Sequence, residues 1–478
     1  MHRKISILLI FSCFFFGLKA QLPVKINSPQ TLQQESHMFR QKYRHTAIKP
    51  YFIQTNDTFF VHPAVETDIR AGGKGLFGIT GTGGEVYYKK DKFAIWSALL
   101  GGLAINPPWW QKATFPQIGR ETAINGKLNL WKDIRVVASY KTRFITFIAG
   151  RSKFHLGESF HSLWLSGYSP ALPFIGARVD IGPIFYGYQI HWLQNPDLRF
   201  PDKPLFHAFN ITHYLDFSLG PMNITMFETV VQDPIDSLGA HRGFDINYLN
   251  PVIFFRAVDL SLGSPDNVLL GLGGSLKILP GTQIYGYGLL DEMIVSQLRA
   301  GTHCWCLKYG LNAGIKSYDA FKIPGLYLQA EASTVRPYTY SHDNPILAYG
   351  NLYQPLAHPL GANFYESLVH LAYMKDKFFI SVEASAALYG QDIDTLNYGK
   401  DIFRPYTTRI GDYGILTGQG NRTMAFYTSV SLQRKIFSNT WLKFSIIYRK
   451  ENSSQPDSWL LLGLGLTSQL YDLRWDWH

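Results

Sequence analysis

Aromatic residues stand near arginine, asparagine, aspartate or histidine in four long segments, 107–132, 154–172, 336–364 and 390–422, the last of which includes Tyr406, Arg409 and Asp412. Aromatic faces cover the apolar faces of sugar rings, and neighbouring polar groups bind the hydroxyls, so this mixture suits carbohydrate binding. The candidate binding residues are Trp109, Trp110, Arg336, Tyr338, Tyr340, His342, Tyr349, Tyr353 and His358.

Catalytic patterns are weak. Ser341, His342 and Asp343 are adjacent, but a catalytic triad is defined by geometry, which neighbours in sequence do not provide. The fragment Gly-Glu-Ser-Phe-His-Ser lacks the glycine spacing of a nucleophile elbow. Asp291 and Glu292 would point to opposite faces of a strand, which makes them poor partners for glycoside hydrolysis. We therefore expect no enzyme, no catalytic residue and no cofactor.

Two cysteines flank a tryptophan in the run His-Cys-Trp-Cys that begins at His303. At strand spacing, Cys304 and Cys306 share one face and His303 points the other way, so no converging set of metal ligands is apparent. A disulfide across one residue would be strained. We expect two small side chains on a strand, no disulfide and no metal.

Strands must position these candidates. Apolar and polar residues alternate with a period of two in segments 206–219, 326–333, 378–388, 441–449 and 460–470. A uniformly apolar face on each strand is typical of a transmembrane β-barrel. A soluble sandwich would show the same alternation, but the N-terminal leader described below and the length of the array favour the barrel.

Charged and amide residues interrupt the apolar runs of segment 244–292, where a hydrophobic core would leave them without partners. A barrel accommodates them because one face of each strand faces a wet lumen. The candidate lumen-lining residues are Arg178, Glu228, Arg256, Glu331 and Glu383. An open lumen would pass small solutes, so an outer-membrane channel is the alternative function.

Residues 1–20 have the pattern of a signal peptide: basic residues, an apolar run too short for a spanning helix, and a plausible cleavage after Ala20. A lipoprotein would be cut before Cys13, but the apolar residues after it argue against that. Residues 21–57 are expected to form a periplasmic or plugging segment with a short helix at 31–43. Residues 58–478 are expected to form the barrel.

About nineteen strand candidates follow, including one at 248–262. If one candidate between 248 and 318 does not span, the short links fall at one end and the long loops at the other. That arrangement gives about eighteen antiparallel strands with both termini in the periplasm. The chain carries a formal charge of +10, but it has no nucleic-acid motif, so an anionic glycan is a better partner than nucleic acid.

Several sequence blocks resemble those of RemB-like gliding-motility proteins, within the broader Wzi-like capsule-assembly family of Gram-negative outer membranes. The more specific blocks are Asn-Tyr-Leu-Asn-Pro, Ser-Pro-Asp-Asn, Arg-Pro-Tyr-Thr-Tyr-Ser-His and Leu-Ala-His-Pro-Leu-Gly-Ala-Asn-Phe. The resemblance spans about residues 44–474 and implies an eighteen-stranded outer-membrane barrel. It implies a surface lectin holding capsular polysaccharide in the Wzi branch, and gliding and adhesion in the RemB branch.

The sequence therefore predicts an all-β, transmembrane antiparallel β-barrel of the outer membrane that binds or organises surface polysaccharide. Its expected partners are outer-membrane lipid, that polysaccharide and the outer-membrane assembly machinery. Segment 336–364 is expected to fold over or into the barrel mouth. Its prolines and glycines suit an ordered loop, and its tyrosines would serve either as ligand contacts or as parts of a structural plug. A third explanation is that the aromatics belong to a membrane-interface girdle.

Overall fold

The computed structural model describes residues 59–73, 75–105, 114–115, 119–120, 122–125, 128–196, 205–235, 242–253, 265–437 and 440–468. Several predictions lie outside these residues: the leader 1–20, the segment 21–57 with its helix, Trp109, Trp110 and Arg256.

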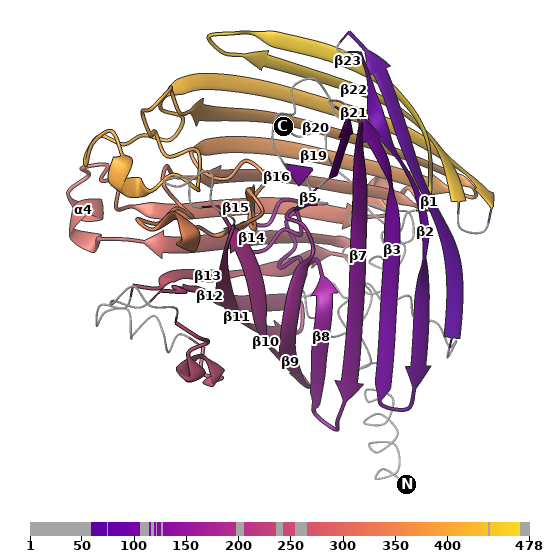
Figure 1. Cartoon of the computed structure of the whole chain (residues 1–478), viewed down its shortest axis with the longest axis horizontal. Helices are drawn as coiled ribbons and strands as arrows, with labels where there is room; N and C mark the ends of the chain where they lie inside the picture. Colours follow the sequence, from indigo (N-terminus) through magenta and orange to yellow (C-terminus); the bar gives the residue numbers. More distant parts are fainter. Residues whose placement is uncertain are drawn as a thin grey trace.

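Most of the described chain forms one antiparallel sheet of nineteen strands. Its shortest strand, β6 (Thr122–Asn125), pairs only with β7. The other eighteen pair in chain order, and β23 pairs with β1, so the sheet closes into a barrel. Figure 1 shows the two closing strands, indigo and yellow, side by side. The predicted barrel of about eighteen strands is confirmed.

The barrel strands are β1 (Phe59–Gly72), β2 (Gly75–Lys90), β3 (Phe93–Ile105), β7 (Leu128–Lys141), β8 (Ile145–Ser152), β9 (Leu172–Ile181), β10 (Ile184–Asn195), β11 (Phe206–Leu219), β12 (Met222–Gln232), β13 (Asn267–Leu279), β14 (Thr282–Glu292), β15 (Lys308–Tyr318), β16 (Leu326–Val335), β19 (Phe364–Lys375), β20 (Phe378–Gln391), β21 (Asn421–Phe437), β22 (Thr440–Asn452) and β23 (Asp457–Thr467).

Short elements lie in the connections between them: β4 (Thr114–Phe115), β5 (Gly119–Arg120), η1 (Ile246–Leu249), α4 (Val295–Arg299), η2 (Ala320–Lys322), η3 (Pro345–Leu347), β17 (Gly350–Asn351), β18 (Gln354–Pro355) and η4 (Tyr406–Thr408). Among the residues described, no helix has the length and apolar character needed to span a membrane.

The outer face of the barrel is apolar, as the alternation predicts. On β23, Leu460, Leu462 and Leu464 are 51%, 50% and 60% exposed, whereas Leu461 between them is fully buried. Exposed leucine, isoleucine and phenylalanine side chains recur on β3, β7, β13 and β22. Such a surface suits the hydrocarbon of a membrane, because inward and outward side chains alternate along each strand.

The long connections gather at one end of the barrel, as predicted, although the two-residue link between β1 and β2 also lies at that end. We call one end the turn end, because it carries tight links such as 91–92, 182–183 and 376–377. The other, the loop end, carries the long connections 153–171, 233–266, 293–307, 336–363 and 392–420.

Of the predicted strand at 248–262, the structure describes residues 248–253, and these form no strand. β12 pairs directly with β13, so no barrel strand lies between them, and residues 246–249 form the helix η1. Asp245 caps this helix by accepting the N–H of Asn247 at 2.9 Å, and Asn250 accepts the N–H of Val252 at 3.1 Å. Local side-chain acceptors of this kind favour turns over strands.

Residues 242–253, which we call the strap, lie against the outer face of the wall. Tyr188 donates its hydroxyl to the carbonyl of Tyr248 at 2.9 Å, and Tyr186 donates to that of Pro251 at 2.7 Å. Because Tyr186 stands near the turn end of β10, the strap runs along the wall away from the loop end. The wall residues packed with Tyr248 are Ile190, Ile211, Val230 and Val268.

Candidate functional site

Two long connections, 153–171 and 336–363, fold into the barrel, and we call them together the plug. Almost all residues of both are buried. Trp164 stacks on Phe227 of β12, with ring centroids 5.2 Å apart. The segments also bind each other, since Tyr340 donates its hydroxyl to the carbonyl of Leu163 at 2.8 Å. The largest hydrophobic cluster joins the plug to the inner wall.

Glu331 of β16 anchors the first plug segment. Its carboxylate accepts the backbone N–H of Phe160 at 2.7 Å and that of His161 at 3.1 Å. The hydroxyl of Tyr285 also donates to it, at 2.7 Å. Hydrogen bonds to an ionised acceptor are among the stronger ones, so this carboxylate determines where the turn at 160–161 sits.

An ion pair provides a second anchor. Glu158 of the plug pairs with Lys316 of β15, and both side chains are fully buried. Gln329 donates to the carbonyl of Glu158 at 3.0 Å, and the N–H of Glu158 donates to the hydroxyl of Tyr287 at 3.1 Å. Loss of one partner would leave a buried charge uncompensated, which is strongly destabilising.

The predicted binding tyrosines of the plug lie in the interior. Tyr338, Tyr340 and Tyr349 are 1%, 0% and 0% exposed. Tyr338 donates its hydroxyl to the carbonyl of Asn397 at 2.8 Å. Burial raises the pKa of Tyr338 to about 12 and that of Tyr340 well above its usual value. In this arrangement the three residues contact protein, as a structural plug requires.

Other predicted residues of this segment have mixed surroundings. Tyr353 is half-buried, with its ring centroid 6.3 Å from that of Phe403. His358 is fully buried beside Glu366. His342 is half-buried at the loop end, where its ring lies 5.9 Å from that of Tyr406. Of the described binding candidates, His342 and Tyr353 are the ones not fully enclosed.

His342 belongs to a group that we call the loop-end cluster: Trp305, Tyr406, Arg409 and His342. The rings of Trp305 and Tyr406 stack with centroids 4.7 Å apart, and the Arg409 guanidinium carbon lies 4.3 Å from the Trp305 ring. All four side chains are half-buried, and nearby Tyr413 is 62% exposed. Aromatic and guanidinium groups presented in this way can contact sugar rings and acidic substituents.

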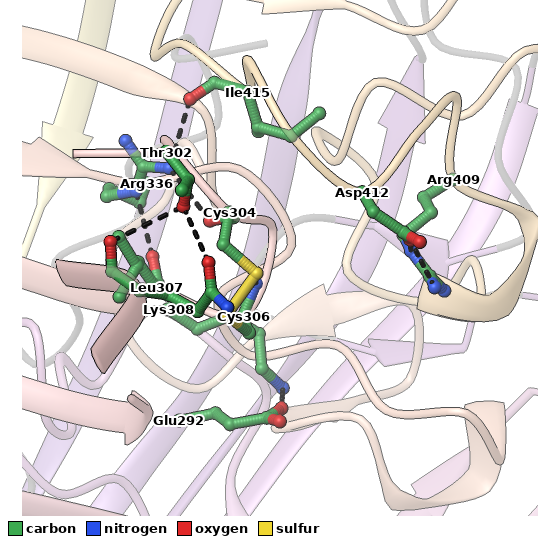
Figure 2. The surroundings of a disulfide bond; sticks show 11 residues. Glu292, Thr302, Cys304, Cys306, Leu307, Lys308, Arg336, Arg409, Asp412 and Ile415 are labelled. Atoms are coloured by element: carbon green, nitrogen blue, oxygen red, sulfur yellow. Dashed lines mark hydrogen bonds and ion pairs between the residues drawn. A yellow bond between two sulfur atoms is a disulfide. The ribbon is translucent and has the colours of Figure 1, made fainter. Parts of the chain in front are cut away.

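Arg336 holds the loops beneath this cluster (Figure 2). Its guanidinium donates to the carbonyls of Leu307 at 2.8 Å, Cys304 at 3.3 Å and Ile415 at 3.0 Å. The side chain therefore joins connection 293–307 to connection 392–420. This buried candidate supports the loops; it does not face solvent.

The cysteine prediction is wrong: Cys304 and Cys306 form a disulfide. They lie in a turn before β15, where His303 adopts a left-handed backbone with φ 51°. The chain bends there, so the strand spacing assumed from the sequence does not apply. Trp305 lies between the two cysteines in the chain, and its backbone N–H donates to the carbonyl of Asp412 at 3.0 Å.

Charges at the loop end are paired. Lys308 lies 2.9 Å from Asp291 and 3.2 Å from Glu292, and Arg409 donates to Asp412 at 2.7 Å. The hydrogen bond from His342 lowers the pKa of Asp343 below its usual value. The cluster thus offers fixed positive and negative groups around its aromatic rings.

The predicted lumen residues separate into two groups. Arg178, Glu331 and Glu383 occupy inward-facing positions, where Arg178 lies over the Phe185 ring and Glu383 is paired across the sheet with His370. Glu228, contrary to the prediction, is on the outer face opposite His213. Polar residues were assumed to face inward, but the strap covers this part of the outer wall.

Sequence reasoning named Tyr406 and Arg409 only as members of the candidate loop 390–422, and it did not select Trp305 as a binding residue. The only available signals were the tryptophan between two cysteines and the charged aromatic stretch 390–422. Their contact depends on two connections that meet only in the folded barrel.

Comparison with known proteins shows similarity in fold. No family model matches the chain, and no curated protein matches it in sequence. The structure of Wzi from Escherichia coli, described as a carbohydrate-binding β-barrel involved in group 1 capsule assembly, aligns with a TM-score of 0.59 and 12% identity, covering 93% of this chain and 99% of that one. The Pseudomonas aeruginosa OpdK structure with vanillate aligns with a TM-score of 0.48 and 6% identity, covering 86% and 97%.

Proposed function

We propose that this protein is a non-enzymatic outer-membrane barrel that binds surface polysaccharide, capsular or exopolysaccharide, at its loop end. The observation that carries the proposal is the loop-end cluster, a half-buried group of aromatic rings with an arginine and a histidine. Arg336 and the disulfide stabilise the connections that carry this cluster at the loop end of the barrel. The similarity in fold to a carbohydrate-binding barrel supports the same function.

Finer features of the proposal rest on the sequence. We infer that residues 1–20 are removed, that the outer-membrane assembly machinery inserts the barrel, and that polysaccharide held at the surface supports adhesion or gliding. Deletion of the gene should reduce capsule retention, and restoration of the wild-type gene should recover it. Unchanged retention and unchanged surface movement would reject this part.

Direct binding is the main test. We expect purified barrel to bind surface polysaccharide from the producing cells, measured by calorimetry or on a glycan array. Tyr413→Ala removes an exposed ring with little effect on packing, and Trp305→Ala removes the centre of the cluster. Each should weaken binding at least about tenfold, which corresponds to about 1.4 kcal/mol.

Tyr140→Ala is the matched control, because Tyr140 is an exposed aromatic residue at the turn end of β7. It should bind like the wild type. Equal binding by all variants, with the barrels still folded by their heat-dependent migration in gels, would contradict the proposal.

A solute channel is the competing function, since inward-facing polar residues line the barrel wall. The anchored plug weighs against it. Planar bilayer recordings separate the two functions: a large steady current through the wild-type protein would favour the channel.

The orientation of the barrel is tested separately. A tag inserted at Ser453, in the loop-end link between β22 and β23, should be accessible on intact cells. A tag at Asp376, in a tight link at the turn end, should be protected. The reverse labelling would place the loop-end cluster in the periplasm and remove it from surface polysaccharide.

A further inference from the structure

We propose that His161, His358 and Glu366 bind a divalent transition-metal ion, of which Zn²⁺ is the best fit, inside the barrel. The Nε2 atom of His358 lies 2.8 Å from Oε2 of Glu366, and Nδ1 of His161 lies 3.1 Å from the same oxygen. The three ligand atoms lie within 4.8 Å of one another. This inference is independent of polysaccharide binding.

The ligand types suit the ion. Zn²⁺ takes imidazole nitrogen and carboxylate oxygen at about 2.0–2.2 Å, commonly with four ligands in a tetrahedron. Ligand atoms in such a site lie roughly 3.3 Å apart, so the two distances to Glu366 need to change by only a few tenths of an ångström. The two histidine nitrogens, which lie within 4.8 Å of each other, would approach by up to about 1.5 Å. Three protein ligands would leave the fourth position for a water molecule.

Burial makes the group unusual. The side chains of His161, His358 and Glu366 are 5%, 0% and 1% exposed. The rings of Phe364 and Phe160 lie 4.3 Å from His358 and 5.1 Å from His161, measured between centroids. An ion held here would be shielded from bulk solvent, which strengthens its attraction to the carboxylate.

One oxygen of Glu366 points to an additional ligand. Within the described part of the chain, Oε1 of Glu366 is buried and has no hydrogen-bond partner. Both oxygens of nearby Glu331, in contrast, accept backbone N–H groups. Buried polar atoms without partners are rare, and a bound ion is one common explanation. Direct coordination by this carboxylate would remove the difference between the two glutamates.

Metal binding requires a change of tautomer at both histidines, because Nδ1 of His161 also donates to Glu366. Nδ1 of His358 accepts the N–H of Leu360 at 3.1 Å, so the ring proton is on Nε2 and faces Glu366. Coordination through Nε2 moves that proton to Nδ1 and costs the hydrogen bond from Leu360. The change of tautomer is a spectroscopic mark of binding, because a simple hydrogen-bonded His–Glu–His group would keep its proton on Nε2.

The three ligands come from three segments. His161 belongs to plug segment 153–171, His358 to plug segment 336–363, and Glu366 to wall strand β19. The ligand set is complete only when both plug segments are docked. The ion would therefore fasten the plug to the wall beside the carboxylate of Glu331.

The test uses full-length, tag-free protein in detergent, treated with chelator and equilibrated with Zn²⁺. A second sample is unfolded and refolded with Zn²⁺ present, so that a closed plug does not prevent entry. We expect about one zinc per chain by elemental analysis in at least the refolded sample, and a tetrahedral absorption spectrum when Co²⁺ replaces Zn²⁺. Hydrogen exchange of residues 153–171 should slow when the metal binds.

His161→Gln and His358→Gln should each weaken zinc binding by about 100-fold or more. His370→Gln is the matched control, because His370 is also a buried histidine on β19 but lies outside the trio, and it should bind zinc like the wild type. Less than a tenth of a zinc per wild-type chain in both samples, or equal binding by all variants, would overturn the proposal and leave a hydrogen-bonded group alone.

Discussion

The plug and the strap both leave the loop end and lie along the barrel wall, the plug on its inner face and the strap on its outer face. The plug is held by charged groups, Glu331 and the pair of Glu158 with Lys316. The strap meets the wall through tyrosine hydroxyls and an apolar cluster. The same wall therefore binds two irregular segments by different means.

The difference follows from what lies beyond each segment. The exposed side of the strap carries Ile246, Leu249 and Val252, which are 73%, 53% and 57% exposed. Irregular backbone next to hydrocarbon must have its polar groups bonded within the protein. Tyr186 and Tyr188 supply two such bonds to strap carbonyls.

Breaking the buried ion pair of the plug should have the largest effect. Lys316→Met leaves the carboxylate of Glu158 buried without its cation, which should lower the free energy of unfolding by about 3–5 kcal/mol. Urea unfolding and hydrogen exchange of residues 153–171 would measure it. The double variant with Glu158→Leu should recover most of the loss, and a double variant as unstable as the single one would show that the charges do not anchor the plug.

Glu331→Ala should cause the second largest loss in the free energy of unfolding. It removes the acceptor of two buried N–H groups and one hydroxyl, and the expected loss is about 2–3 kcal/mol. Glu331→Gln retains one carbonyl acceptor and should lose less. The two variants are compared by the same urea unfolding, and equal stability of both would show that these bonds are not needed.

Tyr188→Phe tests the strap with a smaller change. It removes one hydrogen bond to the Tyr248 carbonyl, worth about 1 kcal/mol, and should loosen the strap while the barrel stays folded. Faster trypsin cleavage at Arg242, which pairs with Asp245 and Asp266, would report it. Tyr140→Phe, elsewhere on the outer face, should leave cleavage unchanged; an equal rise in both variants would contradict the role of the strap contact.

The pair of half-buried His342 with Asp343, whose side chain is 53% exposed, should give the smallest of these effects. Its hydrogen bond lowers the folded-state pKa of Asp343 from the usual 3.8. The carboxylate therefore stabilises the loop above that pH, and this contribution is lost as the pH falls through the lowered value. Solvent limits it to about 0.5 kcal/mol. Asp343→Asn should remove this acid dependence from the fluorescence of the loop-end tryptophan; an unchanged titration would exclude it.

The strand array was predictable because the membrane requires an apolar outer face, so the period of two is visible along β16, β20 and β23. That same rule placed Glu228 inside, and it fails on β12, where Tyr248 of the strap packs against Val230 on the outer face. The strand predicted from residue 248 onward arose from an apolar run, but the first part of that run forms a turn that depends on Asp245 and Asn250. Local residue patterns can indicate a turn, but they did not indicate which face of the barrel wall the segment would cover.

The contacts of the interior could not be derived in this way. His161 and Glu366 are separated by 205 residues, and no local pattern marks them as neighbours. Trp305 and Tyr406 likewise meet only where two connections cross. The sequence showed that segment 336–364 is unusual in its prolines and tyrosines, but a ligand surface and a plug require the same residue types.

The seam between β1 and β23 has a consequence for assembly order. It pairs Glu66 with Thr467, and the hydroxyl of Thr467 donates to Glu66 at 2.8 Å across 401 positions of the chain. The charged plug anchors lie on β15 and β16, which are neighbours in the sheet and far from the seam along the ring. The first plug segment can therefore dock onto an open, partly formed sheet. Closure of the seam, the longest-range pairing in the ring, would then enclose an interior that is already in place.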